Sequence, residues 1–494
     1  MTTTLDATTF DSYDPATGAV LSTWPVHADA DVRAAVARAR TAAVVWEGFG
    51  FAGRRQRLVA WKAEIARSTA ELARVVHGEN GKPFADAVLE VALAVEHIAW
   101  AAKHAPRVLG ARRVRSGALA ANQASTLEYL PLGVVGVLGP WNYPVFTPMG
   151  SLAYALAAGN AVVFKPSEHT PAVGAWLVQA WQRAVPDSAD VLQLVTGAGA
   201  TGAALCRADV DKIAFTGSAS TGRAVMAACA EGLVPVLLAC GGKDAMIVTD
   251  GADVAAAADA ALWGAMSNAG QTCIGIERVY VTEGSYDAFV RELTSRAAAL
   301  EPGSGEGASY GPITMPSQVA VIERHIADAV ASGGRVLTGG TVDGAYVSPT
   351  VLVDVPETSS AVTEETFGPT VTVTRVRDAE EALRRKNATA YGLAGSVFAS
   401  SSSAGMDLAR RMRTGMTSVN SVIAFASVPG LPFGGVGESG FGRIHGDDGL
   451  REFTRAKAIT RQRFALPVAL MSFSRPEKVT GQLVRAVRLL HGRG

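Results

Sequence analysis

Residues 29–110 carry apolar side chains three and four positions apart. The segments DADVRAAVARARTAAVVW, FAGRRQRLVAWKAEIARSTAELARVV and FADAVLEVALAVEHIAWAAKHA follow this spacing, with Arg, Lys and Glu between the apolar positions. A period of 3.6 residues is typical of a helix that buries one face. The pattern therefore predicts amphipathic helices in this part of the chain.

From about residue 132 short apolar runs alternate with helical stretches. The first series is GVVGVLG, NAVVFKP, VLQLVTG, KIAFTGS and PVLLACGG, and the second includes DAMIVTD, ERVYVTE, TVTVTRV, GSVFAS and TSVNS. Buried strands separated by helices indicate a parallel sheet with helices on its faces. We therefore predict an α/β protein with two such domains, which meet near Gly241–Gly242.

The composition narrows the class of protein. At 494 residues the chain exceeds the size of a single hydrophobic core, and an apolar fraction of 48% excludes a disordered chain. Lys plus Arg equals Asp plus Glu, 45 each, which gives no general electrostatic reason to bind nucleic acid or an anionic membrane. Four cysteines fit a reducing cytosol rather than a disulfide scaffold.

No targeting or membrane-spanning segment is evident in the sequence. The N-terminus MTTTLDATTFDSYDP lacks the features of a signal peptide, and no stretch of about 20 residues is apolar throughout. We therefore expect a cytoplasmic protein without a membrane span. The tail run FALPVALMSF is too short to cross a bilayer, and it could pack on a partner subunit or lie on a surface.

Cys273 is the first candidate for chemistry. It lies in SNAGQTCIGIERVYV, between a helical stretch and a β-rich run. If a helix N-terminus points at this thiol, its pKa falls and its thiolate becomes a nucleophile. The alternative is a small buried apolar residue.

Three further segments follow expected strands, where α/β sheets place their ligands. Asn142 in PWNYP could donate to a developing oxyanion or could be a turn residue. Lys165 and Glu168 in FKPSE could contact a ribose or could form a solvated charge pair. The Gly217-Ser218 turn in KIAFTGSASTG begins a helix whose free N–H groups suit a pyrophosphate, although the G-x-G-x-x-G fingerprint is absent.

These segments occur in order with GGK, GQTC, EETFGP and PFGG…SGFGR, and in this arrangement the chain resembles the aldehyde dehydrogenase superfamily from about Asp14 to Ala458. The resemblance implies a Rossmann-like cofactor domain (residues 1–110 and 132–241) and a catalytic α/β domain (residues 242–450). It also implies a small β oligomerisation flap with the C-terminal tail (residues 111–131 and 451–494), and a homodimer or homotetramer.

The resemblance also implies a role for each matched residue. Cys273 would attack the aldehyde carbonyl, and Asn142 with the Cys273 N–H would hold the oxyanion. Hydride then passes to NAD or NADP and leaves a thioester on Cys273. The implied cofactor contacts, with no metal site, are Trp141, Lys165, Ser167, Glu168, Gly217, Ser218, Glu365 and Phe367.

Within this set the resemblance distinguishes the two ends of the cofactor. Lys165 and Glu168 match contacts to the adenosine ribose, and Ser218 matches a pyrophosphate contact. Glu365 matches the ligand of the nicotinamide ribose, with Phe367 packed beside it. Because a carboxylate repels a 2′-phosphate, Glu168 favours NAD, with NADP as the alternative.

The sequence departs from the family at the general base. The family has E-L-G-G-K where this chain has A-C-G-G-K, so that Ala239 replaces the glutamate that deprotonates the cysteine or the hydrolytic water. Cys240, next to it, could be an ordinary core residue or a thiol that forms a disulfide with Cys273. A second acid found in many members is Ile444 here, with His445 beside it.

Three explanations for Ala239 stay open. It could be a laboratory substitution, or it could be natural with His445 or a cofactor-bound water as the substitute base. The acyl group could instead leave to a non-water nucleophile such as coenzyme A. Alternatives of another kind are a cofactor-binding protein without turnover and acyl transfer or esterase activity through Cys273 alone.

The expected substrate pocket is apolar, which fits an aliphatic or aromatic aldehyde better than a charged one. Its expected walls are Tyr143, Phe146, Trp263, Met266, Ile274 and Val422–Phe425.

Overall fold

The computed structural model describes residues 8–466 and 470–492, and its residues cluster into two compact units. Unit 1 comprises Met1–Val108 and Pro131–Thr454, and unit 2 comprises Leu109–Leu130 and Arg455–Gly494. Among the described residues, no helix has both the length and the apolar character needed to cross a bilayer. The tail run FALPVALMSF lies partly outside the described residues.

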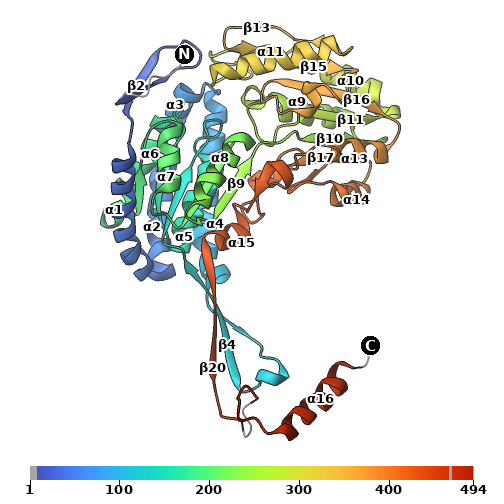
Figure 1. The fold of residues 1–494 in the computed structure, drawn as a ribbon. Helices are drawn as coiled ribbons and strands as arrows, with labels where there is room; N and C mark the ends of the chain where they lie inside the picture. The colour runs from blue at the N-terminus through green and yellow to red at the C-terminus, as the bar shows by residue number, and fades with distance from the viewer. Residues whose placement is uncertain (1–7, 467–469, 493–494) are drawn as a thin grey trace. The chain divides into compact units, whose positions relative to one another are not determined.

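The helices predicted over residues 29–110 are confirmed (Figure 1). They are α1 (Asp29–Gly48), α2 (Gly50–Arg67), α3 (Thr69–Asn80) and α4 (Phe84–Leu109). The apolar stripe of α1 ends at Trp46, which is fully buried and donates to the Leu156 carbonyl at 3.0 Å. Gly81 ends α3 in the left-handed conformation, with a φ of 85° that favours glycine. A hairpin of β1 (Thr9–Tyr13) and β2 (Val20–Pro25) precedes these helices.

The first sheet of unit 1 has the strand order β19-β9-β8-β5-β6-β7, and it is parallel except for β19. Its strands are β5 (Val134–Leu138), β6 (Ala161–Lys165), β7 (Leu192–Leu194), β8 (Lys212–Gly217), β9 (Val236–Cys240) and β19 (Gly440–Phe441). The helices between them are α5 (Phe146–Ala158), α6 (Pro171–Ala184), α7 (Gly199–Arg207) and α8 (Ala219–Ala230). The chain runs outward from β5 to β7 and then crosses back to β8. The order therefore reverses between β5 and β8, where doubly wound sheets open a crevice for a ligand.

The second sheet of unit 1 has the order β12-β15-β16-β11-β10-β17-β18 and is parallel except for β12. Its strands are β10 (Ala245–Val248), β11 (Arg278–Thr282), β12 (Arg335–Thr338), β15 (Thr350–Val353), β16 (Thr370–Val376), β17 (Gly395–Phe398) and β18 (Ser418–Val419). Met246 and Val248 pack in one apolar cluster, whereas Ala245 and Ile247 pack in another. Both faces of β10 are thus buried, which explains its continuous apolar sequence.

The other elements of unit 1 are helices and short strands around these sheets. The helices are α9 (Val254–Met266), α10 (Glu283–Ala298), α11 (Pro316–Ala331), α12 (Ser360–Thr363), α13 (Ala379–Asn387), α14 (Ser402–Arg411) and α15 (Gly446–Glu452). A small ribbon pairs β13 (Val342–Asp343) with β14 (Tyr346–Val347). The 3-10 turns are η2 (Pro186–Val191), η3 (Ser267–Gly270), η4 (Ala424–Ser427) and η5 (Gly437–Ser439).

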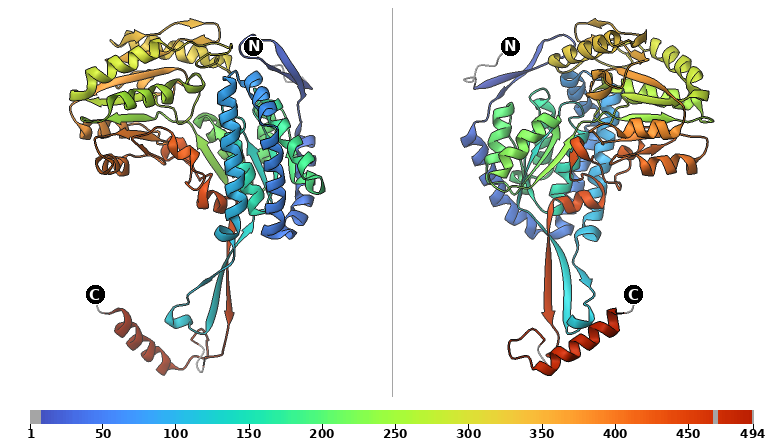
Figure 2. Two further views of the ribbon diagram at one scale, coloured as in Figure 1. Left: turned by 180° about the vertical axis from the view of Figure 1, so that it is seen from behind. Right: turned by 45° about the vertical axis from the view of Figure 1, so that its right-hand side comes forward.

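Unit 2 is a three-stranded sheet followed by a helix (Figure 2). The sheet has the order β20-β4-β3, formed by β3 (Arg112–Val114), β4 (Gln123–Pro131) and β20 (Thr454–Gln462), with the turn η1 (Ala118–Ala120). The helix is α16 (Glu477–His491). The predicted fold class, two parallel α/β layers with a small β unit, is confirmed. Both large sheets belong to one compact unit, and the chain passes between them through residues 241–244.

Candidate active site

Cys273 lies in the turn between η3 and β11 and lines a cavity of about 150 Å³. The backbone before it is unusual, because Asn268, Ala269 and Gly270 all have positive φ values of 52°, 55° and 71°. A Cβ on Gly270 would lie 2.0 Å from the Gly368 carbonyl, so glycine is required there. Strained backbone of this kind is concentrated at functional sites, where the surrounding structure holds it.

The condition for a lowered pKa of Cys273, a helix N-terminus that points at the thiol, is not met. No helix among the described residues begins at this thiol, since η3 ends at Gly270 and the next element is the strand β11. Burial instead raises the pKa of Cys273 to about 12, and the carboxylates of Glu365 and Asp244 raise it further in that order. In this state the thiol is protonated at neutral pH, so its reaction requires a proton acceptor.

The loop that carries Asn142 is tied by hydrogen bonds to the loop that carries Cys273. The Asn142 side-chain amide donates to the Gln271 carbonyl at 3.0 Å, and the Asn142 carbonyl accepts from the Asn268 amide at 3.0 Å. The Tyr143 and Thr272 hydroxyls are 3.0 Å apart. The loop after β5 and the loop before β11 therefore form one hydrogen-bonded structure, and Tyr143, Asn268 and Thr272 from these loops line the same cavity as Cys273.

A buried ion pair between Lys82 and Glu90, which was not predicted from the sequence, fixes the loop that carries Asn142. The Lys82 ammonium donates to Glu90 at 2.5 Å and to the Asn142 carbonyl at 2.8 Å, and neither charged side chain is exposed. The other oxygen of Glu90 accepts the N–H groups of Val145 and Phe146 at the start of α5, at 2.7 and 3.0 Å. In the sequence, Glu90 resembles a solvated charge of an amphipathic helix, and Lys82 resembles a charge in the loop between two helices. The sequence carries no signal that pairs them.

The cavity wall agrees in part with the expected pocket. Tyr143, Phe146, Trp263, Ile274 and Ile423 line it, whereas Met266, Val422, Ala424 and Phe425 do not. Apolar residues that were not expected also contribute, namely Leu89, Leu93 and Phe433. Three charged side chains, Lys82, Asp86 and Glu90, also line the cavity, and Lys82 and Glu90 neutralise each other.

The residues expected to contact the adenosine ribose cluster at the end of β6. The buried Lys165 ammonium lies 3.8 Å from Glu168 and donates to the Pro166 carbonyl at 2.9 Å. Burial lowers the pKa of Lys165, and Glu168 opposes that shift. The Ser167 hydroxyl donates to Glu168 at 3.3 Å. Lys165 is therefore buried whereas Glu168 is partly exposed, so the pair is neither fully desolvated nor the freely solvated pair of the alternative interpretation.

The Gly217-Ser218 turn ends β8 and begins α8, as predicted. Ser218 is exposed and caps the helix, because its hydroxyl accepts the Thr221 N–H at 3.2 Å. This open helix start lies on β8, directly beside β5 in the sheet, and β5 leads to Trp141 and Asn142. An exposed helix N-terminus at the reversal of strand order is suited to a phosphate group.

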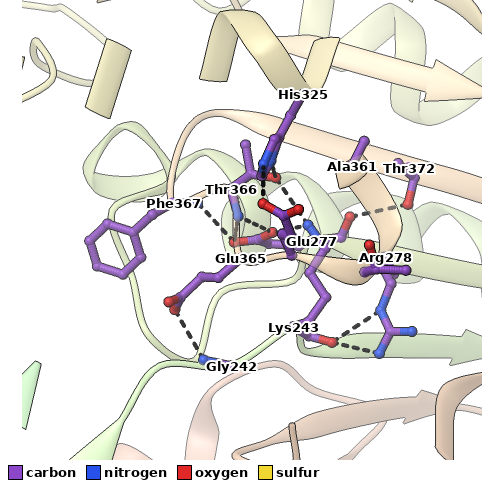
Figure 3. Close-up of polar contacts among 12 residues, drawn as sticks. Gly242, Lys243, Glu277, Arg278, His325, Ala361, Glu365, Thr366, Phe367 and Thr372 are labelled. Atoms are coloured by element: carbon purple, nitrogen blue, oxygen red, sulfur yellow. Dashed lines mark hydrogen bonds and ion pairs between the residues drawn. The ribbon is translucent and has the colours of Figure 1, made fainter. Parts of the chain in front are cut away.

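Glu365 and Phe367 lie on a loop that a second buried ion pair fixes (Figure 3). Glu277 is paired with the Lys243 ammonium and accepts the N–H groups of Thr366 and Phe367 at 2.8 and 3.0 Å. The Phe367 ring packs edge-on against Trp141, with centroids 5.5 Å apart. This contact joins the loop to the segment that carries Asn142.

The Glu365 carboxylate points away from the second ion pair and toward the junction of the two sheets. It accepts the Gly242 N–H at 3.0 Å, and a Cβ on Gly241 would lie within 2.2 Å of both carboxylate oxygens. Burial raises the pKa of Glu365 to about 8, and the charge of Glu277 adds to the shift. A carboxyl in this state can exchange a proton near neutral pH.

Ala239 and His445 supply no obvious base beside Cys273. Ala239 is buried on β9, paired with Thr216 and Gly440. His445 lies within an aromatic cluster, with its ring centroid 3.8 Å from that of His97 and the two planes tilted by 40°, and it is not among the residues that line the cavity. Burial lowers the pKa of His445 well below its usual value.

Comparison with known proteins places the chain in a family. The model of the aldehyde dehydrogenase family matches residues 2–459. The chain is 35% identical to 4,4'-diapolycopene aldehyde oxidase of Methylomonas sp over 93% of this chain and 87% of that protein. It is 36% identical to glutarate-semialdehyde dehydrogenase of Pseudomonas putida, over 90% and 92%.

Solved structures agree with this result. An NADP-dependent enzyme of Escherichia coli matches with a TM-score of 0.88 and 33% identity over 92% of this chain and 95% of that one. Lactaldehyde dehydrogenase of the same organism matches with a TM-score of 0.89 and 31% identity over 93% and 97%. The chain belongs to the aldehyde dehydrogenase family, whose members oxidise aldehydes to acids with NAD(P). The resemblance identified in the sequence is confirmed.

Proposed function

We propose that this chain oxidises an uncharged aldehyde through a covalent adduct on Cys273, and that release of the acyl group is its slow step. The observation that carries the proposal is the joined pair of loops, in which Asn142 is bonded to Gln271, two residues before Cys273, and Cys273 lines a largely apolar cavity. Cys273 forms the bond to the carbonyl carbon. The Asn142 amide and the Cys273 N–H stabilise the resulting oxyanion, since hydrogen-bond donors fixed at that position are worth about 10²–10³ in rate.

The residues around the β5–β8 reversal fit a dinucleotide. When bound, NAD(P) supplies the acceptor for the hydride that leaves the adduct. The open start of α8 at Ser218 would hold the pyrophosphate, and Lys165 with Glu168 would hold the adenosine ribose. Glu365 would hold the nicotinamide ribose. The preference for NAD rests on Glu168, whose carboxylate disfavours a 2′-phosphate; comparison of the binding affinities for NAD and NADP tests it.

Because position 239 carries an alanine, hydrolysis of the thioester is the slow step of the proposed reaction. A water molecule that attacks the acyl carbon must lose a proton, and a methyl side chain cannot accept it. Positioned proton transfer contributes roughly 10²–10⁴ in rate, so hydrolysis should be slower by about that factor while hydride transfer persists. His445 is a poor substitute because it is enclosed by aromatic rings. Transfer of the acyl group to a thiol such as coenzyme A stays a separate hypothesis.

Rapid mixing of enzyme, NAD and a panel of aldehydes tests this function. NADH should appear in a burst near one equivalent per Cys273, followed by turnover that is at least a hundredfold slower. Steady turnover without a burst would mean that another base acts, and the absence of a burst with every aldehyde would favour a binding protein without turnover. Acceleration of the slow phase by coenzyme A would support acyl transfer instead. Loss of the burst in Cys273→Ala is the matched control.

We further propose the domain roles given by the family resemblance. Residues 1–110 and 132–241 would bind the cofactor, and residues 242–450 would carry the nucleophile. Residues 111–131 and 451–494 would join subunits in a homodimer or homotetramer. Sedimentation of the purified protein measures the assembly directly, and a monomer would contradict the last point.

A further inference from the structure

The two units differ sharply in charge, although the whole chain has none. Residues 109–130 and 455–494, which form unit 2, contain twelve Lys and Arg but only two Asp and Glu, a net charge of +10. Since the chain has 45 residues of each sign, the rest of it carries −10. The neutral total therefore conceals a strongly cationic small unit, and the expectation drawn from net charge alone does not apply to it.

The cationic side chains of unit 2 are not neutralised within the described residues. None of them forms an ion pair with an acidic side chain in residues 8–466 and 470–492. Arg463 and Arg475 instead donate to the backbone carbonyls of Ala121 and Leu470, at 2.6 and 2.7 Å. The positive charge is thus available to an external anion.

Helix α16 separates apolar and basic residues on opposite sides. At 100° per residue, Val479, Leu483, Val487 and Leu490 lie on one side, and the basic side is formed by Lys478, Arg485 and Arg488. Val479 is buried, whereas Val487 and Leu490 are 49% and 64% exposed. The apolar side is therefore covered only at its beginning.

The exposed apolar surface continues along the chain before the helix. Phe464 is 54% exposed, Met471 is 97% exposed and Phe473 is fully exposed. Large apolar side chains next to unpaired cations are costly in water, but they suit the boundary between lipid headgroups and acyl chains.

We propose that α16 and the preceding segment dock unit 2 on an anionic lipid surface. The apolar side chains of α16 enter the boundary region, and Lys478, Arg485 and Arg488 contact the negative headgroups, so that β3, β4 and β20 stay available for the subunit contact proposed above. Charge argues against symmetric pairing of this surface with its copy on a second chain, because two +10 units would face each other. Docking on the acidic remainder of a second chain is the competing outcome that the experiment must separate.

Flotation of the full-length protein with vesicles tests the proposal. The wild type should float with phosphatidylcholine vesicles that contain phosphatidylserine, but not with phosphatidylcholine alone, and added salt should release it. Each Lys or Arg near such a surface strengthens binding about fivefold, so K478Q/R485Q/R488Q should weaken it about a hundredfold. Val487→Glu with Leu490→Glu should also release the protein. Leu233→Glu, at a 90% exposed position of unit 1, is the matched control and should bind as the wild type does.

Two results would overturn the proposal: equal binding of the wild type to both kinds of vesicle, and no binding to either. If the wild type binds neither and a helix variant has a lower oligomeric mass in sedimentation, the occupant of this surface is a second copy of the chain. Unchanged thermal unfolding of the variants shows that any loss of binding is not due to misfolding.

Discussion

Restoring a glutamate at position 239 gives the sharpest test of the proposed chemistry. Ala239 is 6% exposed on β9, two residues before Gly241, which contacts the Glu365 carboxylate. A carboxylate introduced here adds to a group of buried acids in which Glu365 already has a pKa raised to about 8. The new base should accelerate hydrolysis of the thioester by roughly 10²–10⁴, equivalent to about 3–5 kcal/mol of activation free energy.

Stopped-flow measurement of NADH separates the two phases for Ala239→Glu. The burst reports deprotonation of Cys273 and hydride transfer, whereas the slow phase reports attack of water on the thioester, so the two effects of a new base are measured separately. The slow phase should rise toward the burst rate, and it should rise with pH because a buried carboxyl among other carboxylates ionises late. Ala239→Gln has nearly the same size but accepts no proton, so it is the control. Equal slow phases in the Glu and Gln variants would refute the assignment of a missing base, and so would an unchanged slow phase in Ala239→Glu.

Three further predictions follow from the site geometry. Asn142→Ala should slow the burst by about 10²–10³ without abolishing alkylation of Cys273, and a burst of normal rate would exclude the amide as an oxyanion donor. Lys82→Met should lower the free energy of unfolding by roughly 3–5 kcal/mol, because it leaves Glu90 buried without its cation. In denaturant unfolding, the double variant Lys82→Met/Glu90→Gln should regain part of this free energy. Additive losses in the two single variants and the double variant would contradict the pairing. The Glu365 anion raises the pKa of Cys273, so removal of this charge in Glu365→Gln should lower that pKa. The rate of Cys273 alkylation by iodoacetamide, measured against pH, should then have its midpoint at a lower pH. An unchanged or higher midpoint would count against this coupling.

The buried ion pairs illustrate what the sequence conceals. In the sequence, Lys82 and Glu90 cannot be told apart from charged residues that face solvent. In the folded chain both are buried, and Lys82 donates to the carbonyl of Asn142. Glu277 is similar, since only the packing of β11 against the loop of Glu365 reveals its two backbone contacts. A one-dimensional pattern does not report which charged groups lose their water.

The parallel α/β layers, the N-terminal helices and the family can be read from the order of residues, because hydrophobic period and motif order depend on local spacing. The positions of Cys273, Asn142 and Ala239 along the chain can be read in the same way. Three properties require the folded chain: burial raises the pKa of Cys273, aromatic rings enclose His445, and unit 2 gathers unpaired positive charge. These properties depend on the distances between residues far apart in the chain and on the water that folding removes.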